Sequence, residues 1–234
     1  MKTIGIIGGL GPEATVDYYN LLIDSFKDDS GSLNYPEIII YSVNMSEFLG
    51  LMREKKYDSA ARKVADKAEA LKRAGADFAA ITANTPHMLF DQITGLSPLP
   101  LISIVEATCE ECMKMGVKRA GLMGTGFTMN ATFYQDVFKK HGLEVLVPEA
   151  SDRELINHKL FTEIELGIFR DETRQILVGI IEKMVSEQKI DSIILGCTEL
   201  PLILKEPSYS GIPALNTTKI HVDAIVKYCV ESKA

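Results

Sequence analysis

The sequence has no tryptophan, no excess of positive charge and no long uncharged apolar run. A membrane-spanning helix needs about 20 predominantly apolar residues, and no segment approaches that length. The net charge of −7 argues against a nucleic-acid-binding protein, because a basic stripe that would neutralise phosphates is missing. We therefore expect neither a membrane nor a nucleic acid as partner, and a small molecule as the ligand.

Cysteine is also scarce, with four in 234 residues. The first residues are typical of a strand rather than of a signal peptide, because glycines and then Pro12 interrupt the apolar run. Reduced thiols in a cytoplasmic protein are therefore expected. Cys109 and Cys112 form a C-x-x-C pair in a helical pattern, where this spacing places two small apolar side chains on one face. No second Cys/His pair lies near them in the sequence, so we expect packing roles and no metal site.

Short apolar runs alternate with longer amphipathic patterns along the chain, which predicts an α/β fold. Continuous apolar strands separated by helices indicate a mostly parallel sheet covered on both faces and joined by right-handed crossovers. The expected strands are residues 3–8, 37–43, 78–82, 101–102, 119–124, 143–147, 192–195 and 214–215. The expected helices lie near residues 12–27, 45–54, 57–74, 104–115, 131–141, 152–166, 171–188 and 218–232.

Two breaks divide the chain into lobes. Prolines at 98 and 100 form the first break, and residues 206–211, with Pro207 and Gly211, form the second. We expect a first lobe of residues 1–97 plus 208–234 and a second lobe of residues 98–207. Each lobe would be a mostly parallel sheet flanked by helices, with the active site in the cleft between the two, where ligands bind by default.

The segment most indicative of chemistry follows the strand at 192–195. Cys197, Thr198 and Glu199 place a thiol, a hydroxyl and a carboxylate at the carboxyl end of a buried strand, which is where an open α/β sheet binds its ligands. Thr198 and the start of the following helix are expected to lower the pKa of the thiol.

The strand at 78–82 is followed by a similar polar segment without a thiol. Ala83 stands at its centre, and Asn84 and Thr85 supply amide and hydroxyl groups. Alternation along a continued strand would place Ala83 and Thr85 on one side and Thr82 and Asn84 on the other. His87 could act as a base or a donor, but we expect it behind the residues that touch the ligand.

Two glycine-containing loops predict binding of carboxylate groups. Gly9 and Gly11 lie between the first strand and the first helix, where backbone N–H groups can hold an anion. Pro12 and a glutamate after it break the dinucleotide-binding fingerprint, so a carboxylate fits better than a pyrophosphate. Thr125 and Thr128 lie in a loop of the same character in the second lobe, which favours a ligand with more than one anionic group.

In combination, these motifs resemble the aspartate/glutamate racemase family, the cofactor-independent amino-acid racemases. Five motifs occur in order along most of the chain. They are Gly8-Gly9-x-Gly11-Pro12-x-Ala14-Thr15, x-Asn84-Thr85-x-His87, Gly124-Thr125-x-x-Thr128-Met129 followed by Phe133-Tyr134, Gly196-Cys197-Thr198-Glu199-Leu200 and Thr217-Thr218-Lys219-Ile220-His221.

The resemblance implies an isomerase that racemises an amino acid through a carboxylate-stabilised carbanion, with aspartate or glutamate as the favoured substrate class. In the family, one cysteine removes the α-proton and a second returns a proton to the other face, with neither pyridoxal phosphate nor a metal. Cys197 matches the second cysteine. The residues expected to hold the substrate are Gly9, Gly11, Asn84, Thr85, Thr125, Thr128, Thr198 and Glu199. A homodimer is expected from the relatives.

This sequence departs from the family at the first cysteine, which aligns with Ala83. The second proton donor of a racemase could then be a water, Thr85 or His87. Alternatively, the chain is a one-cysteine decarboxylase or lyase, similar to arylmalonate decarboxylases, or the alanine was introduced experimentally. A non-catalytic homologue that binds a small molecule is a further alternative. The basic residues that would hold a distal carboxylate are also not evident in residues 44–48 or 161–165.

Overall fold

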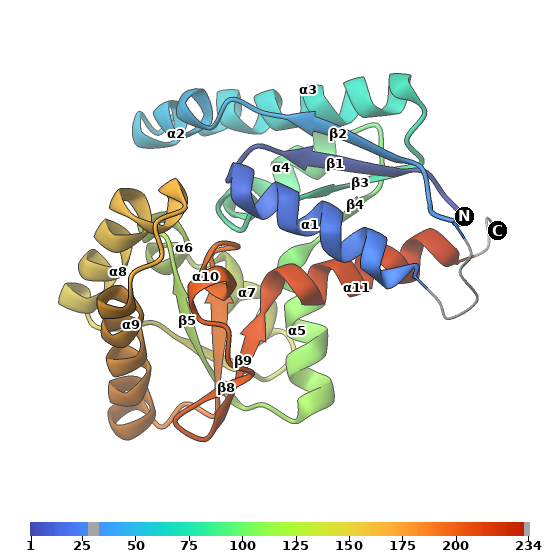
Figure 1. Ribbon diagram of the computed structural model, residues 1–234. Coiled ribbons are helices and arrows are strands. Elements are labelled where there is room, and N and C mark those ends of the chain that lie inside the picture. The colour runs from blue at the N-terminus through green and yellow to red at the C-terminus, as the bar shows by residue number, and fades with distance from the viewer. Residues whose placement is uncertain (28–32, 232–234) are drawn as a thin grey trace. The chain divides into compact units, whose positions relative to one another are not determined.

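The computed structural model describes residues 1–27 and 33–231. Its contacts divide the chain into two compact units, one formed by Met1–Ile104 with His221–Ala234 and the other by Val105–Ile220. Each unit contains a sheet of mostly parallel strands flanked by helices, which confirms the predicted α/β class (Figure 1). Within the described ranges, no helix has both the length and the apolar character needed to cross a membrane.

The first unit is built on four parallel strands in the order β2-β1-β3-β4. These are β1 (Ile4–Gly8), β2 (Ile38–Ser42), β3 (Phe78–Ile81) and β4 (Leu101–Ile102). Its helices are α1 (Pro12–Ser25), α2 (Met45–Arg53), α3 (Tyr57–Ala74), the 3₁₀ turn η1 (Thr85–Leu89), α4 (Phe90–Leu96) and most of α11 (Thr217–Val230).

Helices cover both faces of this sheet. On one face, Tyr18 and Leu22 of α1 and Ile225 of α11 join Ile4 and Phe78 in one apolar cluster. On the other face lies α3, whose alanine-rich stripe at helical spacing is buried and allows a close approach to the strands. The helix α3 ends at a glycine in the left-handed conformation, as the sequence predicted.

The second unit has five strands in the order β6-β5-β7-β9-β8. They are β5 (Arg119–Gly124), β6 (Glu144–Leu146), β7 (Ser192–Gly196), β9 (Ile212–Asn216), all parallel, and the antiparallel β8 (Ser208–Tyr209). Its helices are α5 (Ile104–Met115), α6 (Gly126–Asn130), α7 (Phe133–Lys139), α8 (Ala150–Thr162), η2 (Ile164–Leu166), α9 (Asp171–Lys183), the π turn η3 (Met184–Gln188) and α10 (Leu200–Ile203). A core between α8, α9 and the sheet includes Ile156, Leu177 and Ile193.

The two sheets share one strand order, because β6-β5-β7-β9 repeats β2-β1-β3-β4. In each sheet the chain runs from one central strand to the edge on one side, and from the other central strand to the edge on the opposite side. Ligands bind at the carboxyl ends of two such central strands. In the first unit these strands are β1 and β3, and in the second unit they are β5 and β7. All the candidate site residues of the sequence analysis lie in or next to the four loops that follow these strands.

Three features differ from the sequence predictions. The unit boundaries differ from 97/98 and 207/208, because β4 pairs with β3 in the first sheet while β8 and β9 belong to the second. The strand β2 lies at the edge of its sheet, so Ile40 and Tyr41 are exposed although the run is apolar. The helix expected at 152–166 ends at Thr162, and the 3₁₀ turn η2 follows it.

Candidate active site

Cys197 lies directly after β7, at the end of a strand that is buried along its whole length. Two glycines allow β5 and β7 to pack closely at this end, where Gly124 and Gly196 are register partners. A Cβ on Gly124 would lie 2.6 Å from the Gly196 carbonyl oxygen, and a Cβ on Gly196 would lie 2.5 Å from a methyl group of Leu122. Glycine is therefore required where the loop bearing Cys197 begins.

The Cys197 thiol lies between two carboxylates. Its Sγ donates to Glu199 Oε2 at 3.2 Å and approaches Glu165 Oε1 at 3.5 Å. Cys197 and Glu199 are 5% and 1% exposed, and Glu165 is partly buried on η2. Because the thiol has one proton, it can satisfy only one of the two carboxylates at a time.

These surroundings raise the pKa values of both the thiol and Glu165. Burial raises the pKa of Cys197 well above its usual value, and the charges of Glu199 and Glu165 add to this effect. Burial, followed by the charge of Glu199, raises the pKa of Glu165 to about 8. The expectation that Thr198 and the next helix lower the pKa of Cys197 is therefore wrong for the protein as it stands. The thiol rests protonated, and Glu165 is poised to exchange a proton near neutral pH.

Glu165 was missed as a site residue in the sequence. It lies 32 residues before Cys197, in a short turn that the periodicity merged into one long helix. Glycine at 167, in the left-handed conformation with φ 72°, marks the end of this turn and was the available signal. A carboxylate that follows a helix end is common at protein surfaces, so the sequence alone gives no reason to place it next to a thiol.

The hydroxyl groups around Cys197 are engaged within the second unit. Thr198 Oγ1 donates to Glu199 Oε2 at 3.0 Å, and Thr198 is 2% exposed. Thr125 accepts the Thr128 N–H at the start of α6, and the two hydroxyls lie 3.2 Å apart. The sequence therefore correctly identified groups that gather at the ends of β5 and β7, while their contact with a substrate remains a prediction.

In the first unit, Thr15 organises the loop after β1. Its Oγ1 accepts the Gly9 N–H at 2.9 Å and donates to the Gly11 carbonyl at 3.0 Å. Gly9 has φ 79°, and a Cβ there would lie 2.5 Å from the Val43 carbonyl oxygen. Because Thr15 uses the Gly9 N–H, Gly9 serves to shape the loop in this structure and does not offer the backbone donor that the sequence suggested.

The segment after β3 turns at once into η1, so the strand alternation expected for residues 82–85 does not continue. Ala83 is 4% exposed and Asn84 is 3% exposed. The Thr82 hydroxyl lies 3.4 Å from both Thr15 Oγ1 and the Ile7 carbonyl oxygen, inside the unit. Ala83 therefore places a buried methyl group shortly after the end of β3.

Both ring nitrogens of His87 are occupied. Nδ1 lies 2.9 Å from the Ala83 carbonyl oxygen and must donate to it, while Nε2 accepts the Ile104 N–H at 3.3 Å. Burial lowers the pKa of His87 to about 3, with the nearby His221 as the next cause. His221 is bound in a similar way, by Tyr18 and by the Ile102 carbonyl, and burial lowers its pKa to about 4. His87 is therefore neutral and held by backbone groups, while its place behind the residues that touch the ligand stays a prediction.

Glu165, Cys197 and Glu199 are also the group of potential metal ligands found among the described residues, with ligand atoms that lie within 4.8 Å of one another. A thiolate and carboxylates are ligands that Zn²⁺ accepts.

The C-x-x-C pair, Cys109 and Cys112, is buried in α5, where burial raises the two pKa values to about 11 and about 12.

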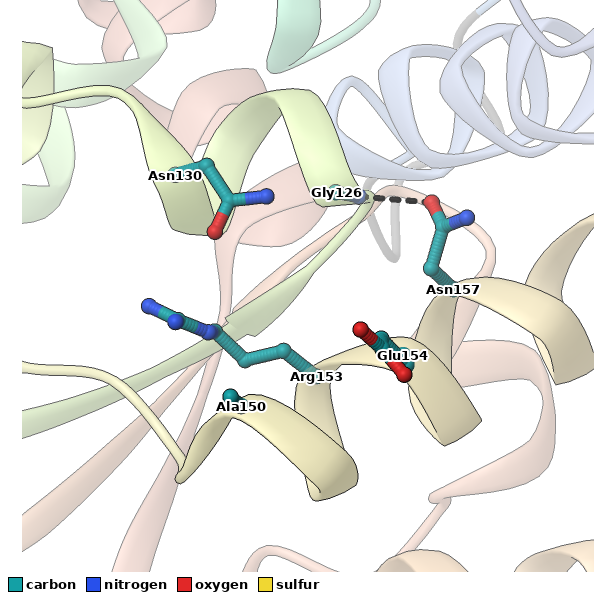
Figure 2. Close-up of a pocket in the computed structure, with 6 residues that line it drawn as sticks. All are labelled: Gly126, Asn130, Ala150, Arg153, Glu154 and Asn157. Atoms are coloured by element: carbon teal, nitrogen blue, oxygen red, sulfur yellow. Dashed lines mark hydrogen bonds between the residues drawn. The ribbon is translucent and has the colours of Figure 1, made fainter.

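A separate hollow of about 140 Å³ lies between α6 and α8 (Figure 2). The Gly126 N–H at its edge donates to Asn157 Oδ1 at 2.7 Å. Arg153 lines this hollow and supplies a basic residue in the first turn of α8, earlier than the positions that the sequence analysis searched. Cys197 is not among the lining residues, so the hollow does not by itself mark the place of the chemistry.

Comparison with known proteins gives one consistent result. The broad specificity amino-acid racemase RacX of Bacillus subtilis is 28% identical over 218 residues, which cover 92% of both chains. An aspartate racemase homologue from Pyrococcus horikoshii OT3 has a TM-score of 0.84 and 37% identity, over 99% of this chain and 100% of the other. A Yersinia pestis protein described as a candidate Asp/Glu racemase has a TM-score of 0.88 and 35% identity, over 99% and 100% of the two chains.

A sequence profile of the Asp/Glu/Hydantoin racemase family matches residues 7–225, which is nearly the whole chain. The strand-end motifs at Gly9, Asn84, Thr125 and Cys197 all fall within the matched range. The chain belongs to the Asp/Glu/Hydantoin racemase family.

Proposed function

We propose that this protein is a cofactor-independent amino-acid racemase in which Cys197 transfers the α-proton and Glu165 exchanges a proton with the thiol. The observation that carries the proposal is the contact of one buried thiol with two carboxylates at the end of β7. The pKa of Glu165, raised to about 8, suits a group that takes up and returns a proton near neutral pH.

The proposed proton transfers balance as follows. In the fraction of molecules in which Glu165 is ionised, it takes the proton of Cys197, which leaves a thiolate. The thiolate then removes the α-proton, so that an S–H bond forms, the C–H bond breaks and the electron pair spreads onto the substrate carboxylate. Oriented donors such as Thr125 and Thr128 would stabilise that charge. A proton delivered to the opposite face by the second donor completes inversion, after which Glu165 releases its proton to solvent and the second donor takes one up. A proton returned from Cys197 restores the original enantiomer.

The charge around the thiol favours an amino acid as substrate. Among the described residues, burial and carboxylates account for the raised pKa values of Cys197 and Glu165, and a positive charge contributes to neither. The α-ammonium group of an amino acid would supply such a charge and would lower the pKa of the nearby thiol. A malonate brings only negative charge, so these carboxylates oppose the one-cysteine decarboxylase alternative.

Ala83 is the reason to consider a one-cysteine lyase or a binding protein beside the racemase. A methyl group transfers no proton, and both ring nitrogens of His87 are already engaged. We propose a water or Thr85 as the second proton donor. A one-cysteine lyase or a protein that only binds its ligand would need no second donor, and each of these predicts a different outcome in isotope exchange.

Aspartate or glutamate is the substrate class that we propose, because the matching family model is that of the Asp/Glu/Hydantoin racemases. Asn84, Thr85, Thr125, Thr128 and Thr198 are proposed to bind its carboxylate and amino groups, with Gly11 as a backbone contact. By analogy with the family, we propose a cytoplasmic homodimer that needs no added cofactor.

The proposal is tested by incubating single enantiomers of aspartate and glutamate with the protein in D₂O, followed by NMR and chiral chromatography. Deuterium incorporation with inversion supports the racemase. Exchange from one enantiomer without inversion indicates a one-base enzyme, and release of CO₂ from aryl malonates indicates the decarboxylase. Binding without exchange or CO₂ release would leave a non-catalytic binding protein and would overturn the proposal.

A further inference from the structure

The turn that carries Glu165 is buried at its start and exposed at its end. Every residue from 166 to 170 is exposed, and the exposed fraction of Leu166 is 65%. Only the residues just before Glu165 are buried, with Glu163 at 6% exposure and Ile164 at 0%. The location of Glu165 therefore depends on how these two residues are held, because the rest of the turn makes little contact with the core.

The Glu163 carboxylate connects both helices that flank the turn. It accepts hydrogen bonds from Lys159 Nζ of α8 at 2.5 Å and from the buried Thr173 hydroxyl of α9, and Arg170 Nη1 lies 3.9 Å away. These partners hold the pKa of Glu163 below its usual value, with the Lys159 hydrogen bond as the main cause. The Glu163 carboxylate thus binds one side chain of α8 and one of α9, and the Arg170 guanidinium lies near it.

The main chain of Glu163 closes the turn as well. Its carbonyl oxygen accepts the N–H groups of Leu166 and Ile168, both at 3.0 Å, and Glu165 lies inside the loop that these bonds close. A negative side chain at the C-terminal end of a helix opposes the helix dipole. The pair with Lys159 is an i,i+4 contact of α8, whereas the bond to Thr173 holds the start of the turn against α9.

We propose that Glu163 is a positioning residue, which holds the 163–168 turn so that Glu165 stays against the Cys197 thiol. The inference rests on the proposed function only in assuming that the state of this thiol matters for the reaction. Glu163 itself touches neither the thiol nor a substrate in this account. Its effect passes through Glu165, so loss of Glu163 should reproduce loss of Glu165 at Cys197.

The test measures the thiol and does not need turnover. The alkylation rate of Cys197 by iodoacetamide is followed against pH, with the Cys197 peptide quantified by mass spectrometry, in the wild type, E163Q, E165Q and the double variant. Above about pH 8, where Glu165 is ionised, removing its charge lowers the thiol pKa, and each unit gives about tenfold more thiolate at a given pH. We expect E163Q and E165Q to shift the profile to lower pH, and the double variant to match E165Q.

Matched variants separate positioning from general stability. E149Q removes a 2.8 Å ion pair between Glu149 and Lys183, which also joins α8 to α9, and should leave the profile unchanged. If E163Q does not fold, T173V removes one hydrogen bond to Glu163 and should give a smaller shift, while T173S should restore the wild-type profile. An E163Q or T173V protein with a lower Tm but an unshifted profile would overturn the inference. A double variant shifted beyond E165Q would do the same.

Discussion

Replacing Glu165 by glutamine should make the protein more stable at high pH. The carboxyl pKa is 4.5 in its ordinary state and about 8 in the folded protein. Between these values the folded state binds more protons than the unfolded chain, so the free energy of unfolding falls as the pH rises through this window. E165Q keeps the shape of the side chain and removes this titration.

The magnitude follows from the width of the window. Each pH unit between the two pKa values changes the free energy of unfolding by about 1.4 kcal/mol, so a rise from pH 5.5 to 8 costs the wild type about 3 kcal/mol through this group. Glu165 Oε2 has no hydrogen-bond partner among the described residues, and the glutamine NH₂ that replaces an oxygen adds a constant cost of about 1–3 kcal/mol. The informative quantity is therefore how the difference in free energy of unfolding between E165Q and the wild type changes with pH.

Urea unfolding of the wild type and E165Q at both pH values measures this change. The stability of E165Q relative to the wild type should increase by about 3 kcal/mol from pH 5.5 to 8. The exposed Glu172 gives a matched control, since E172Q should show no such increase. A stability difference that stays constant with pH, or that moves in the opposite direction, would refute the burial and charge coupling described here.

Three further predictions follow from other parts of the two units. Restoring a thiol with A83C should raise the rate of racemisation relative to the parent chain, measured by chiral chromatography, and no gain would show that position 83 does not act in proton transfer. Acidification should unfold the protein, because the pKa values of His87 and His221 are lowered to about 3 and about 4. The pKa of these histidines in the unfolded chain is about 6.5, so the free energy of unfolding falls as the pH drops below that value. At pH 5 the loss is about 2 kcal/mol for each histidine. Urea titrations of H87Q should show about half of the loss that the two histidines cause together. G196A should lower the free energy of unfolding by about 1–3 kcal/mol, because the new Cβ would clash with Leu122. G179A on α9 has open space around it and should be neutral or stabilising. Equal Tm values for the two variants would contradict the packing described at Gly196.

The sequence predicted most of the fold because its signals are local. Continuous apolar runs became the central strands, and Gly75 ended α3 where expected. The unit boundaries could not be predicted in this way, because the prolines at 98 and 100 mark a turn while strand pairing decides which sheet a segment joins. The exposure of β2 likewise depends on its edge position, which the apolar run does not encode.

The site was predicted where its residues are contiguous and missed where they are not. Cys197, Thr198 and Glu199 follow one strand, and their neighbourhood could be inferred from it. Glu165 reaches the thiol only through the packing of α8 and α9, so its contribution and the raised pKa of Cys197 were outside the reach of local patterns. A neighbouring hydroxyl suggested a lowered pKa, but burial raises the pKa of Cys197, and the two carboxylates add to this effect.

The most direct test of the central role of Cys197 is the exchange of the substrate α-proton in D₂O by C197S and C197A, compared with the parent chain. We expect both variants to lose exchange of aspartate or glutamate, while binding of the amino acid, measured by calorimetry, persists. Exchange at the parent rate in either variant would contradict the proposal that this thiol moves the proton.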